Sequence, residues 1–305
     1  MMLRSMLFVP GDSDRKFVRG ADSGADALIL DLEDSVAPPR KDDARAHVAS
    51  LLADPDPGPR RWQFFVRVNA FDTGLTTIDL AAVVAPGLDG IVLPKCEGAA
   101  DVLRLCHMLD ALEAKAGMPN GAVRLVVIAT ETARALFALE TYAPAHPRLA
   151  GLTWGAEDLA AAVGATANKE IDGNWSFPYR LVRAQCLFAA VAAGVAPIET
   201  LYADYRDLDG LAADCRLARR DGFAGRLAIH PDQIATINAC FSPSDADIAM
   251  ARRVVAAFAA APEQGVVGID GKMYDLPHLK AAYRTLASID EARPVRRSAD
   301  PRDQA

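Results

Sequence analysis

Residues 27–38 read ALILDLEDSVAP, and this stretch carries the pattern that decides the fold. A short run of apolar side chains is followed at once by three carboxylates, at Asp31, Glu33 and Asp34. A continuous apolar run predicts a β-strand that is buried on both of its faces. The carboxylates come where that strand ends. The stretch therefore predicts a core strand with polar groups at its C-terminal end.

The same pattern recurs along the chain. Stretches with helical spacing of apolar residues, such as Asp101–Ala116 and Leu181–Ala193, separate the short runs. This alternation predicts parallel strands joined by helices, and eight strands in about 230 residues fit a closed (β/α)₈ (TIM) barrel of the α/β class. An open, doubly wound sheet is the alternative. The expected strands are Ser5–Val9, Ala27–Leu32, Gln63–Val68, Gly90–Pro94, Arg124–Ala129, Gly151–Trp154, Ile198–Tyr202 and Arg226–Ile229.

The domain organisation follows from where this alternation stops. We expect residues 1–242 to form the barrel and residues 243–290 to form a C-terminal helical segment that completes the active site. Residues 291–305 are charged and contain proline, which predicts a disordered tail. One long connection, Thr166–Tyr179, interrupts the barrel pattern, and long barrel loops are often binding loops or lids.

Within the C-terminal segment the pattern predicts two helices. The first covers Ala246–Ala260, and the second starts near Pro277. Gly265 and Gly268 lie between them and predict a turn.

Composition narrows the possible partners. The chain has 305 residues, 51% of them hydrophobic, which is ample for one large core. A net charge of −7 argues against nucleic acid or an anionic membrane as the main partner. No apolar stretch approaches the roughly 20 residues needed to span a bilayer. The cysteines are odd in number and not in CxxC pairs, which favours a reducing compartment, and we expect a cytoplasmic protein. They are Cys96, Cys106, Cys186, Cys215 and Cys240.

Two carboxylates that follow neighbouring strands are the candidate metal ligands. Glu131 comes directly after the fifth strand, and Asp158 follows the sixth. The C-terminal ends of barrel strands meet at one rim, where active sites are found. Mg²⁺ typically takes one or two carboxylates and completes its coordination with water and substrate. The alternative is that both residues cap the helices they precede.

Arg67 stands inside an apolar strand, in FFVRVNA. A buried guanidinium needs carboxylates or a bound anion to offset its desolvation. The functional interpretation is a clamp on a developing enolate or alkoxide. The structural alternative is an ion pair with Asp31 or Glu33.

Nine motifs in order, from Arg4 to about Leu286, resemble the citrate lyase beta-subunit-like family. This group includes malyl-CoA and citramalyl-CoA lyases within the aldolase/citrate lyase superfamily. The motifs are SMLFVPGDSDRKF, ALILDLEDSVAP, VRVNA, GIVLPKCE, ATETARAL, WGAEDLAAAVG, YADYRDLDGL, LAIHPDQI and DGKMYDLP. The resemblance implies a Mg²⁺-dependent barrel that acts on acyl-CoA and assembles as a homotrimer or homohexamer.

The resemblance also implies roles for residues of the barrel. Glu131 in ATETAR and Asp158 in GAEDL correspond to the family's metal ligands, and Arg67 in VRVN to its active-site arginine. Arg15 matches a residue that contacts CoA phosphates, and we expect Lys16 and Pro231 to contribute to CoA binding. Lys16 and Lys41 would face the CoA phosphates, with ordinary solvated surface as the alternative.

The remaining expected roles concern the small substrate and the acid/base. Backbone N–H groups at Gly155 and Ala156, with Glu157 beside them, would bind the 2-oxo acid carboxylate at a helix N-terminus. The resemblance implies an acid/base carboxylate in the C-terminal segment, often contributed by a neighbouring subunit. The candidates in IDGKMYDLP are Asp270 and Asp275, of which Asp275 is favoured. An N-cap is the structural alternative for Asp275.

The expected activity is a carbon–carbon lyase that acts on a 3-hydroxyacyl-CoA such as malyl-CoA or citramalyl-CoA. Its products would be acetyl-CoA or a related acyl-CoA and a small 2-oxo acid. One alternative is a CoA-independent 4-hydroxy-2-oxo acid aldolase, which relies on an early histidine, whereas the first histidine here is His47. Another is a citrate lyase beta subunit that acts on a carrier-protein thioester.

Overall fold

The computed structural model describes residues 3–53 and 60–290, which form two compact units, Leu3–Ala239 and the described residues from Cys240 onward. The expected tail, residues 291–305, lies outside the described residues. In the described part of the chain, no helix combines the length and the apolar character required to cross a lipid bilayer.

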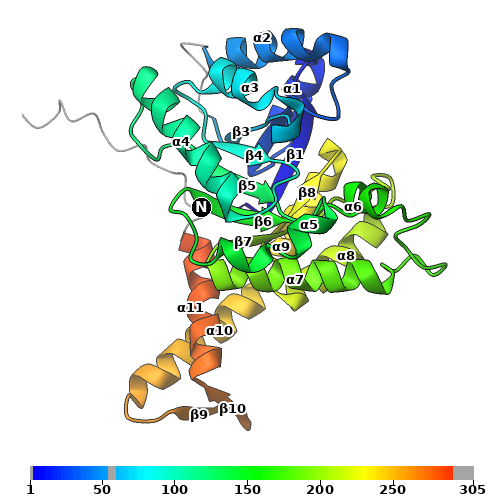
Figure 1. The fold of residues 1–305 in the computed structure, drawn as a ribbon. Helices are drawn as coiled ribbons and strands as arrows, with labels where there is room; N and C mark the ends of the chain where they lie inside the picture. Colours follow the sequence, from blue (N-terminus) through cyan, green and yellow to red (C-terminus); the bar gives the residue numbers. More distant parts are fainter. Residues whose placement is uncertain (1–2, 54–59, 291–305) are drawn as a thin grey trace, which may run out of the picture. The chain divides into compact units, whose positions relative to one another are not determined.

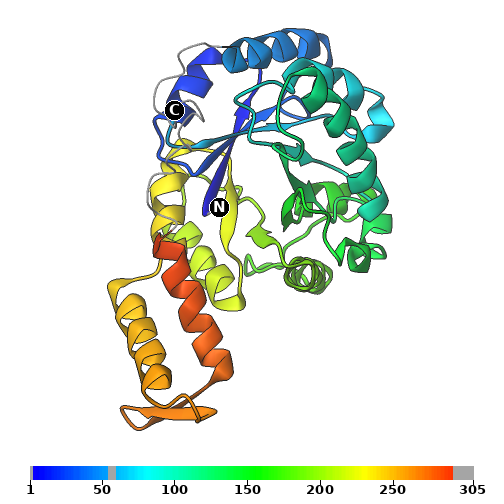
Figure 2. The ribbon, with the colours of Figure 1, turned by 90° about the vertical axis from the view of Figure 1, so that its left-hand side faces the viewer.

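The first unit is a closed barrel of eight parallel strands in sequential order, so the expected (β/α)₈ fold is confirmed. The last strand closes on the first through the pairs Ser5↔Arg226, Met6↔Leu227 and Leu7↔Ala228. Figures 1 and 2 show the strands inside a layer of helices. The strands are β1 (Ser5–Pro10), β2 (Ala27–Asp31), β3 (Gln63–Arg67), β4 (Gly90–Leu93), β5 (Arg124–Ile128), β6 (Leu149–Thr153), β7 (Ala196–Glu199) and β8 (Gly225–Ala228).

The helices of this unit follow the strands in the expected alternation. A 17-residue helix, α7, begins at Phe177 after the long connection that follows α6. The helices are α1 (Asp14–Ala21), α2 (Lys41–Leu52), α3 (Thr76–Val83), α4 (Ala99–Lys115), α5 (Ala133–Leu136), α6 (Ala156–Val163), α7 (Phe177–Ala193), α8 (Leu208–Asp221) and α9 (Ile234–Phe241).

The barrel interior is filled with side chains. Register partners on neighbouring strands point to the same side, so alternate residues of every strand meet in the centre. Most of the central apolar side chains are almost fully buried, which makes the interior a packed core rather than a pore. They include Met6, Ala27, Ile29, Phe65, Val92, Val126, Ile128, Ile198 and Leu227.

The second unit contains two helices, α10 (Asp245–Ala260) and α11 (Leu276–Asp290), as expected. The segment between them is a hairpin of two antiparallel strands, β9 (Val266–Ile269) and β10 (Lys272–Asp275), so the expected simple turn was wrong. Asp270 and Gly271 both have positive φ angles, 51° and 74°. Two such residues form the tight turn that suits the twist of a hairpin.

This unit has an apolar core of its own. Val254 and Phe258 of α10 are buried with Val267 and Ile269 of β9. Ala282 of α11 belongs to the same cluster. The alternate residues of β9 that enter this core explain why the segment folds as a strand.

Candidate active site

Consecutive strands bring the charged residues to one rim of the barrel. Asp31 ends β2 and is the register partner of Arg67, which ends β3. Lys95 lies two residues beyond β4, and Glu131 lies three residues beyond β5. Asp158 is in the first turn of α6, directly after β6. Because the strands are parallel, these positions share the end of the barrel at which catalytic groups are found in this fold.

Arg67 is held by two carboxylates. Its Nε and Nη2 atoms donate to the two carboxylate oxygens of Asp31 at 2.7 Å each, and its Nη1 atom lies 2.8 Å from Oε2 of Glu33. Burial opposes charge on Asp31, but the hydrogen bonds and the positive charge of Arg67 keep the pKa of Asp31 below its usual value. The expected structural ion pair is therefore present, and the guanidinium also lines the cavity described below.

Lys95 connects this ion pair to the next strands. Its Nζ atom donates to Oε1 of Glu33 at 2.6 Å and lies 3.4 Å from Oδ1 of Asp158. Burial alone would lower the pKa of Lys95, but the hydrogen bond to Glu33 and the nearby carboxylates raise it. The ammonium is therefore charged and neutralises part of the acidic rim.

Glu131 is the least compensated carboxylate of the rim. Its exposed fraction is 3%, and the backbone N–H of Lys95 donates to Oε2 at 2.5 Å. Lys95 has a left-handed backbone, with φ of 49°, and this conformation accompanies the short contact from its N–H. Burial, together with the negative charges of Asp158 and Glu33, raises the pKa of Glu131 to about 8. In this environment the carboxylate requires an added positive charge to stay ionised at neutral pH.

Gly155 leaves room for this carboxylate. A Cβ atom at this position would lie 2.6 Å from Cγ of Glu131 and 3.3 Å from Oε1. Any side chain larger than hydrogen would displace Glu131. The glycine in WGAEDL is therefore required by the position of the carboxylate.

A cavity opens at this rim, with an empty volume of about 440 Å³ that includes its open mouth. Three acidic side chains and one guanidinium line it together with apolar and aromatic groups. The lining residues are Phe8, Arg67, Ile128, Glu131, Trp154, Gly155, Ala156, Glu157, Asp158, Trp175, Thr200, Leu201 and Leu227.

The N-terminus of α6 forms part of the cavity wall, although not all of its N–H groups are free. The N–H of Gly155 donates to Oγ1 of Thr130 at 3.2 Å, which argues against its expected role in binding the substrate carboxylate. Ala156 and Glu157 occupy the first turn, where backbone N–H groups have no acceptor within the helix. The Glu157 carboxylate accepts a hydrogen bond from Asn168 at 2.9 Å.

The residues expected to bind CoA lie outside this cavity. Arg15 and Lys16 are exposed on α1. Pro231 is the first residue of a short 3₁₀ helix, Pro231–Gln233, and follows His230, whose ring stacks on Tyr205. Their roles stay predictions.

The ammonium of Lys41 has a structural role instead. It donates to the backbone carbonyls of Leu32 and Glu33 at 2.6 and 2.7 Å. These carbonyls lie just beyond β2, so Lys41 fixes the chain where it leaves that strand. Both bonds argue against the expectation that Lys41 faces the CoA phosphates.

The acid/base candidates belong to the second unit. Oδ1 of Asp275 lies 2.5 Å from Nδ1 of His278 and accepts from the backbone N–H of His278 at 3.4 Å. The hydrogen bond with the His278 side chain is the main reason that the pKa of Asp275 is lowered. This is the capping arrangement considered as the alternative. Asp270 pairs with Arg253 at 2.8 Å.

The detailed positions of two site residues carry no clear signal in the sequence. Lys95 follows a strand, but its left-handed backbone and its contact with Glu131 depend on how the loop packs. Trp175 reaches the cavity from the long connection between α6 and α7. The length and aromatic content of that connection were the only available indication.

The donor set suits Mg²⁺. Among the described residues, no group of three or more His, Cys, Asp or Glu side chains is arranged to hold a metal ion. Two carboxylates at a cavity mouth match an ion that takes most of its ligands from water and substrate. The raised pKa of Glu131 also fits, because a bound cation would supply the missing positive charge.

Comparison with known proteins identifies the family. The model of the HpcH/HpaI aldolase/citrate lyase family matches residues 4–231, more than half of the chain. The chain belongs to this family. The resemblance seen in the nine motifs is confirmed, and with it the class of enzyme, a carbon–carbon lyase.

The relatives fall into several groups by name. A (3S)-malyl-CoA thioesterase of Cereibacter sphaeroides is 36% identical, with 94% of each chain covered. A citrate lyase subunit beta-like protein of Mycobacterium tuberculosis is 35% identical, over 94% of this chain and 95% of the relative. An L-malyl-CoA/beta-methylmalyl-CoA lyase of Cereibacter sphaeroides is 33% identical over 92% of each chain.

A solved structure of similar fold is that of protein CitE from Mycobacterium tuberculosis, in complex with magnesium, acetoacetate and coenzyme A. Its TM-score is 0.74 and its identity 34%, with coverage of 94% of this chain and 97% of CitE. Two further similar structures from Mycobacterium tuberculosis are CitE with magnesium and pyruvate, and a citrate lyase beta subunit with oxaloacetate and magnesium.

Proposed function

We propose that this protein is a Mg²⁺-dependent lyase that cleaves or forms a 3-hydroxyacyl-CoA thioester such as malyl-CoA or citramalyl-CoA. The products of cleavage are acetyl-CoA or a related acyl-CoA and a 2-oxo acid. The observation that carries the proposal is the buried, uncompensated Glu131 beside Asp158 at the mouth of a cavity that Arg67 also lines.

Glu131 and Asp158 would hold the Mg²⁺ ion. When bound, Mg²⁺ polarises the oxygen of the 2-oxo acid carbonyl and orients the acid. Ala156 and Glu157 present backbone N–H groups of the first turn of α6 to the substrate carboxylate. These groups are fixed before the substrate arrives, so orienting the acid requires no rearrangement of the helix.

Arg67 would stabilise the enolate of the acyl-CoA. In cleavage, the 3-hydroxyl gives its proton to the acid/base carboxylate, the carbon–carbon bond breaks as the 2-oxo acid carbonyl forms, and the electron pair of that bond forms the thioester enolate. A guanidinium has five N–H donors, and three contacts hold Arg67 against Asp31 and Glu33. The remaining N–H groups can face the enolate oxygen. Because the two carboxylates fix the guanidinium, it is preorganised for that charge.

Asp275 is the proposed acid/base that returns a proton to the enolate carbon in cleavage and removes it in condensation. We propose that it acts from the C-terminal segment, on the site of a neighbouring subunit in a homotrimer or homohexamer. The test is to mix inactive Arg67→Ala and Asp275→Asn variants under conditions of proven subunit exchange. Partial recovery of activity supports sharing between subunits, and no recovery rules it out. An active Asp275→Asn variant would make Asp270 the next candidate.

A second candidate function is hydrolysis of the thioester. It is favoured by the 36% identity with relatives named (3S)-malyl-CoA thioesterase. Hydrolysis of malyl-CoA gives malate and free CoA thiol, whereas the lyase gives acetyl-CoA and glyoxylate, without free thiol. The two activities can therefore be separated by their products.

The experiment is a screen of purified protein with malyl-CoA, citramalyl-CoA, methylmalyl-CoA and citryl-CoA, with Mg²⁺ and with EDTA. Release of a 2-oxo acid is measured with phenylhydrazine, and free thiol with a disulfide reagent. Mg²⁺-dependent 2-oxo acid without thiol supports the proposal. Thiol without 2-oxo acid identifies a thioesterase. Cleavage of free 4-hydroxy-2-oxo acids alone identifies an aldolase, and activity only on a carrier-protein thioester identifies a subunit of the citrate lyase type.

A further inference from the structure

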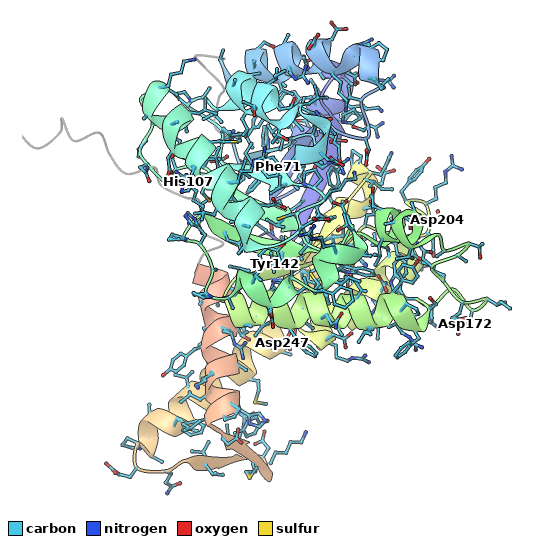
Figure 3. All side chains as sticks on the ribbon, in the orientation of Figure 1. Phe71, His107, Tyr142, Asp172, Asp204 and Asp247 are labelled. Atoms are coloured by element: carbon cyan, nitrogen blue, oxygen red, sulfur yellow. The ribbon has the colours of Figure 1, made fainter. Side chains whose placement is uncertain are left out.

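The connection between α6 and α7 carries a tryptophan, Trp175, that lines the cavity. Trp175 lines the cavity together with Trp154, which directly follows β6. Their ring centroids lie 5.1 Å apart with an interplanar angle of 69°. Figure 3 shows Asp172, of the same connection, on the side of the barrel where Asp204 of the β7–α8 loop also lies. The connection therefore stands at the rim that holds the site.

The backbone of this connection fixes Trp175. Lys169 and Trp175 form an isolated antiparallel bridge. The N–H of Glu170 donates to the carbonyl of Asn174 at 2.8 Å, and the N–H of Ser176 to the carbonyl of Asn168 at 3.0 Å. These bonds make a small hairpin in which Trp175 has a defined position.

Side chains hold the indole from its other faces. The ammonium of Lys169 lies 4.7 Å from the Trp175 ring centroid and 5.6 Å from that of Tyr202. The ring of Tyr179 lies 6.4 Å from that of Trp175. A cation over an indole is an attractive arrangement, and the aromatic neighbours restrict its rotation. Trp175 therefore acts as a wall of the cavity rather than as a loose flap.

The side chains that line the cavity limit which substituent of the 2-oxo acid can lie beside Trp175. Seven of the lining residues are apolar, including both indoles and Ile128, and three are acidic. Among the described residues that line the cavity, Arg67 is the one cation, and it is already paired with Asp31 and Glu33. An uncharged substituent on the 2-oxo acid would meet apolar surface. A second carboxylate would lie among carboxylates without a free cation of its own, which is costly.

We propose that Trp175 is the residue that sets substrate specificity, by limiting the substituent of the 2-oxo acid to a short, uncharged group such as a methyl. This inference rests on the proposed function and deepens it. It selects monocarboxylic 2-oxo acids, and pyruvate above longer homologues. The part of the site that contacts the substituent of the 2-oxo acid is then formed by the α6–α7 connection rather than by the barrel strands.

The test compares condensation of acetyl-CoA with glyoxylate, pyruvate, 2-oxobutyrate, 2-oxovalerate and oxaloacetate. In the wild type, kcat/KM should fall by roughly tenfold or more for each methylene added to pyruvate, as is usual for an apolar wall. It should also be lower for oxaloacetate than for pyruvate. In Trp175→Ala, the ratio of kcat/KM for 2-oxobutyrate to that for pyruvate should rise about tenfold. Trp175→Phe should give an intermediate ratio.

Phe177→Ala is the matched control. Phe177 is two residues further along the chain, is 66% exposed and does not line the cavity. Its truncation should leave the ratios unchanged. Equal ratios in the wild type and in a folded Trp175→Ala protein would overturn the proposal, and so would a wild-type preference for oxaloacetate.

A binding measurement separates this inference from the proposed function. Calorimetric titration of each 2-oxo acid into the protein with saturating Mg²⁺ gives the same preference order without turnover. If the wild type condenses no pair but Trp175→Ala still shifts the order of dissociation constants, the lyase proposal fails and the specificity role stands. If no 2-oxo acid binds, or the order is unaffected by Trp175→Ala, the specificity role fails.

Discussion

Two groups of carboxylates at the same barrel rim differ in how far cations of the protein compensate their charge. At the ends of β2 and β3, Asp31 and Glu33 each have a cation within 2.8 Å, and the pKa of Asp31 is lowered. At the ends of β5 and β6, Glu131 is equally buried, yet its closest donor is a backbone N–H and its pKa is raised to about 8. In the first group Arg67 compensates Asp31, although burial still raises the pKa of Glu33. In the second group Lys95 lies near Asp158, but Glu131 is compensated only when a further cation joins it.

This difference indicates which buried charges have a structural role and which belong to a functional site. A buried ion pair that satisfies itself orients its members. A buried carboxylate with no cation of its own is destabilising unless a ligand compensates it, and such groups cluster at functional sites. Arg67 joins both groups, because Asp31 and Glu33 hold it while it lines the cavity.

The largest expected effect is on turnover in Glu131→Gln. Loss of one metal ligand removes Lewis-acid stabilisation of several kcal/mol, so kcat/KM should fall by roughly a thousandfold or more. Unfolding in urea without Mg²⁺ should show equal or higher stability than the wild type at pH 8, because a neutral amide replaces a poorly solvated charge. Glu140→Gln, at an exposed position, is the control. Wild-type turnover of Glu131→Gln at limiting Mg²⁺ would refute the ligand assignment.

Arg67→Lys tests whether the paired group also serves chemistry. Lysine supplies a point charge without the planar fork that spans Asp31 and the substrate. We expect kcat to fall about tenfold to a thousandfold, the range for removal of one electrostatic donor. Arg134→Lys, which is exposed in a pair with Glu97, should change nothing. If Arg67→Lys folds normally and keeps its kcat, Arg67 is structural only.

Asp31→Asn should act on stability. It leaves a buried guanidinium short of a partner, which costs about 3 kcal/mol of unfolding free energy. Since the pKa of Asp31 is lowered by folding, its contribution is present above the pKa of the unfolded state and is lost as pH falls through the lower, folded value. Urea unfolding should therefore show a gap between wild type and variant at pH 7 that narrows in acid, while Asp72→Asn shows none. A constant gap would argue against the ion pair.

Much of the fold was predictable because each strand is a short apolar run with polar residues at its end. The hairpin in the second unit was missed because its four-residue strands contain Gly268 and are half exposed. The dipeptide Asp270-Gly271 was the available signal, as it favours a tight hairpin turn.

The residues of the site likewise divide into those whose position the sequence predicted and those whose position it did not predict. Residues that directly follow strands, such as Glu131 and Asp158, could be named because strand ends converge in a barrel. Lys95 and Trp175 take their positions from loop packing: one has a left-handed backbone, and the other sits in a hairpin held by side chains. Such positions depend on contacts between segments far apart in the sequence, which a single sequence does not reveal.

The contrast between the two groups rests on the charge of Glu131, and Mg²⁺ titration tests it most directly. With a pKa of about 8, the Glu131 carboxyl is mostly protonated at pH 7 in the metal-free protein, so Mg²⁺ binding should expel about one proton. Calorimetry in two buffers of different ionisation enthalpy measures that proton. We expect about one proton released by the wild type and by Glu140→Gln, and weak binding without proton release in Glu131→Gln. Tight Mg²⁺ binding by Glu131→Gln with the same proton release would contradict the assignment of Glu131 as the ligand that needs the metal.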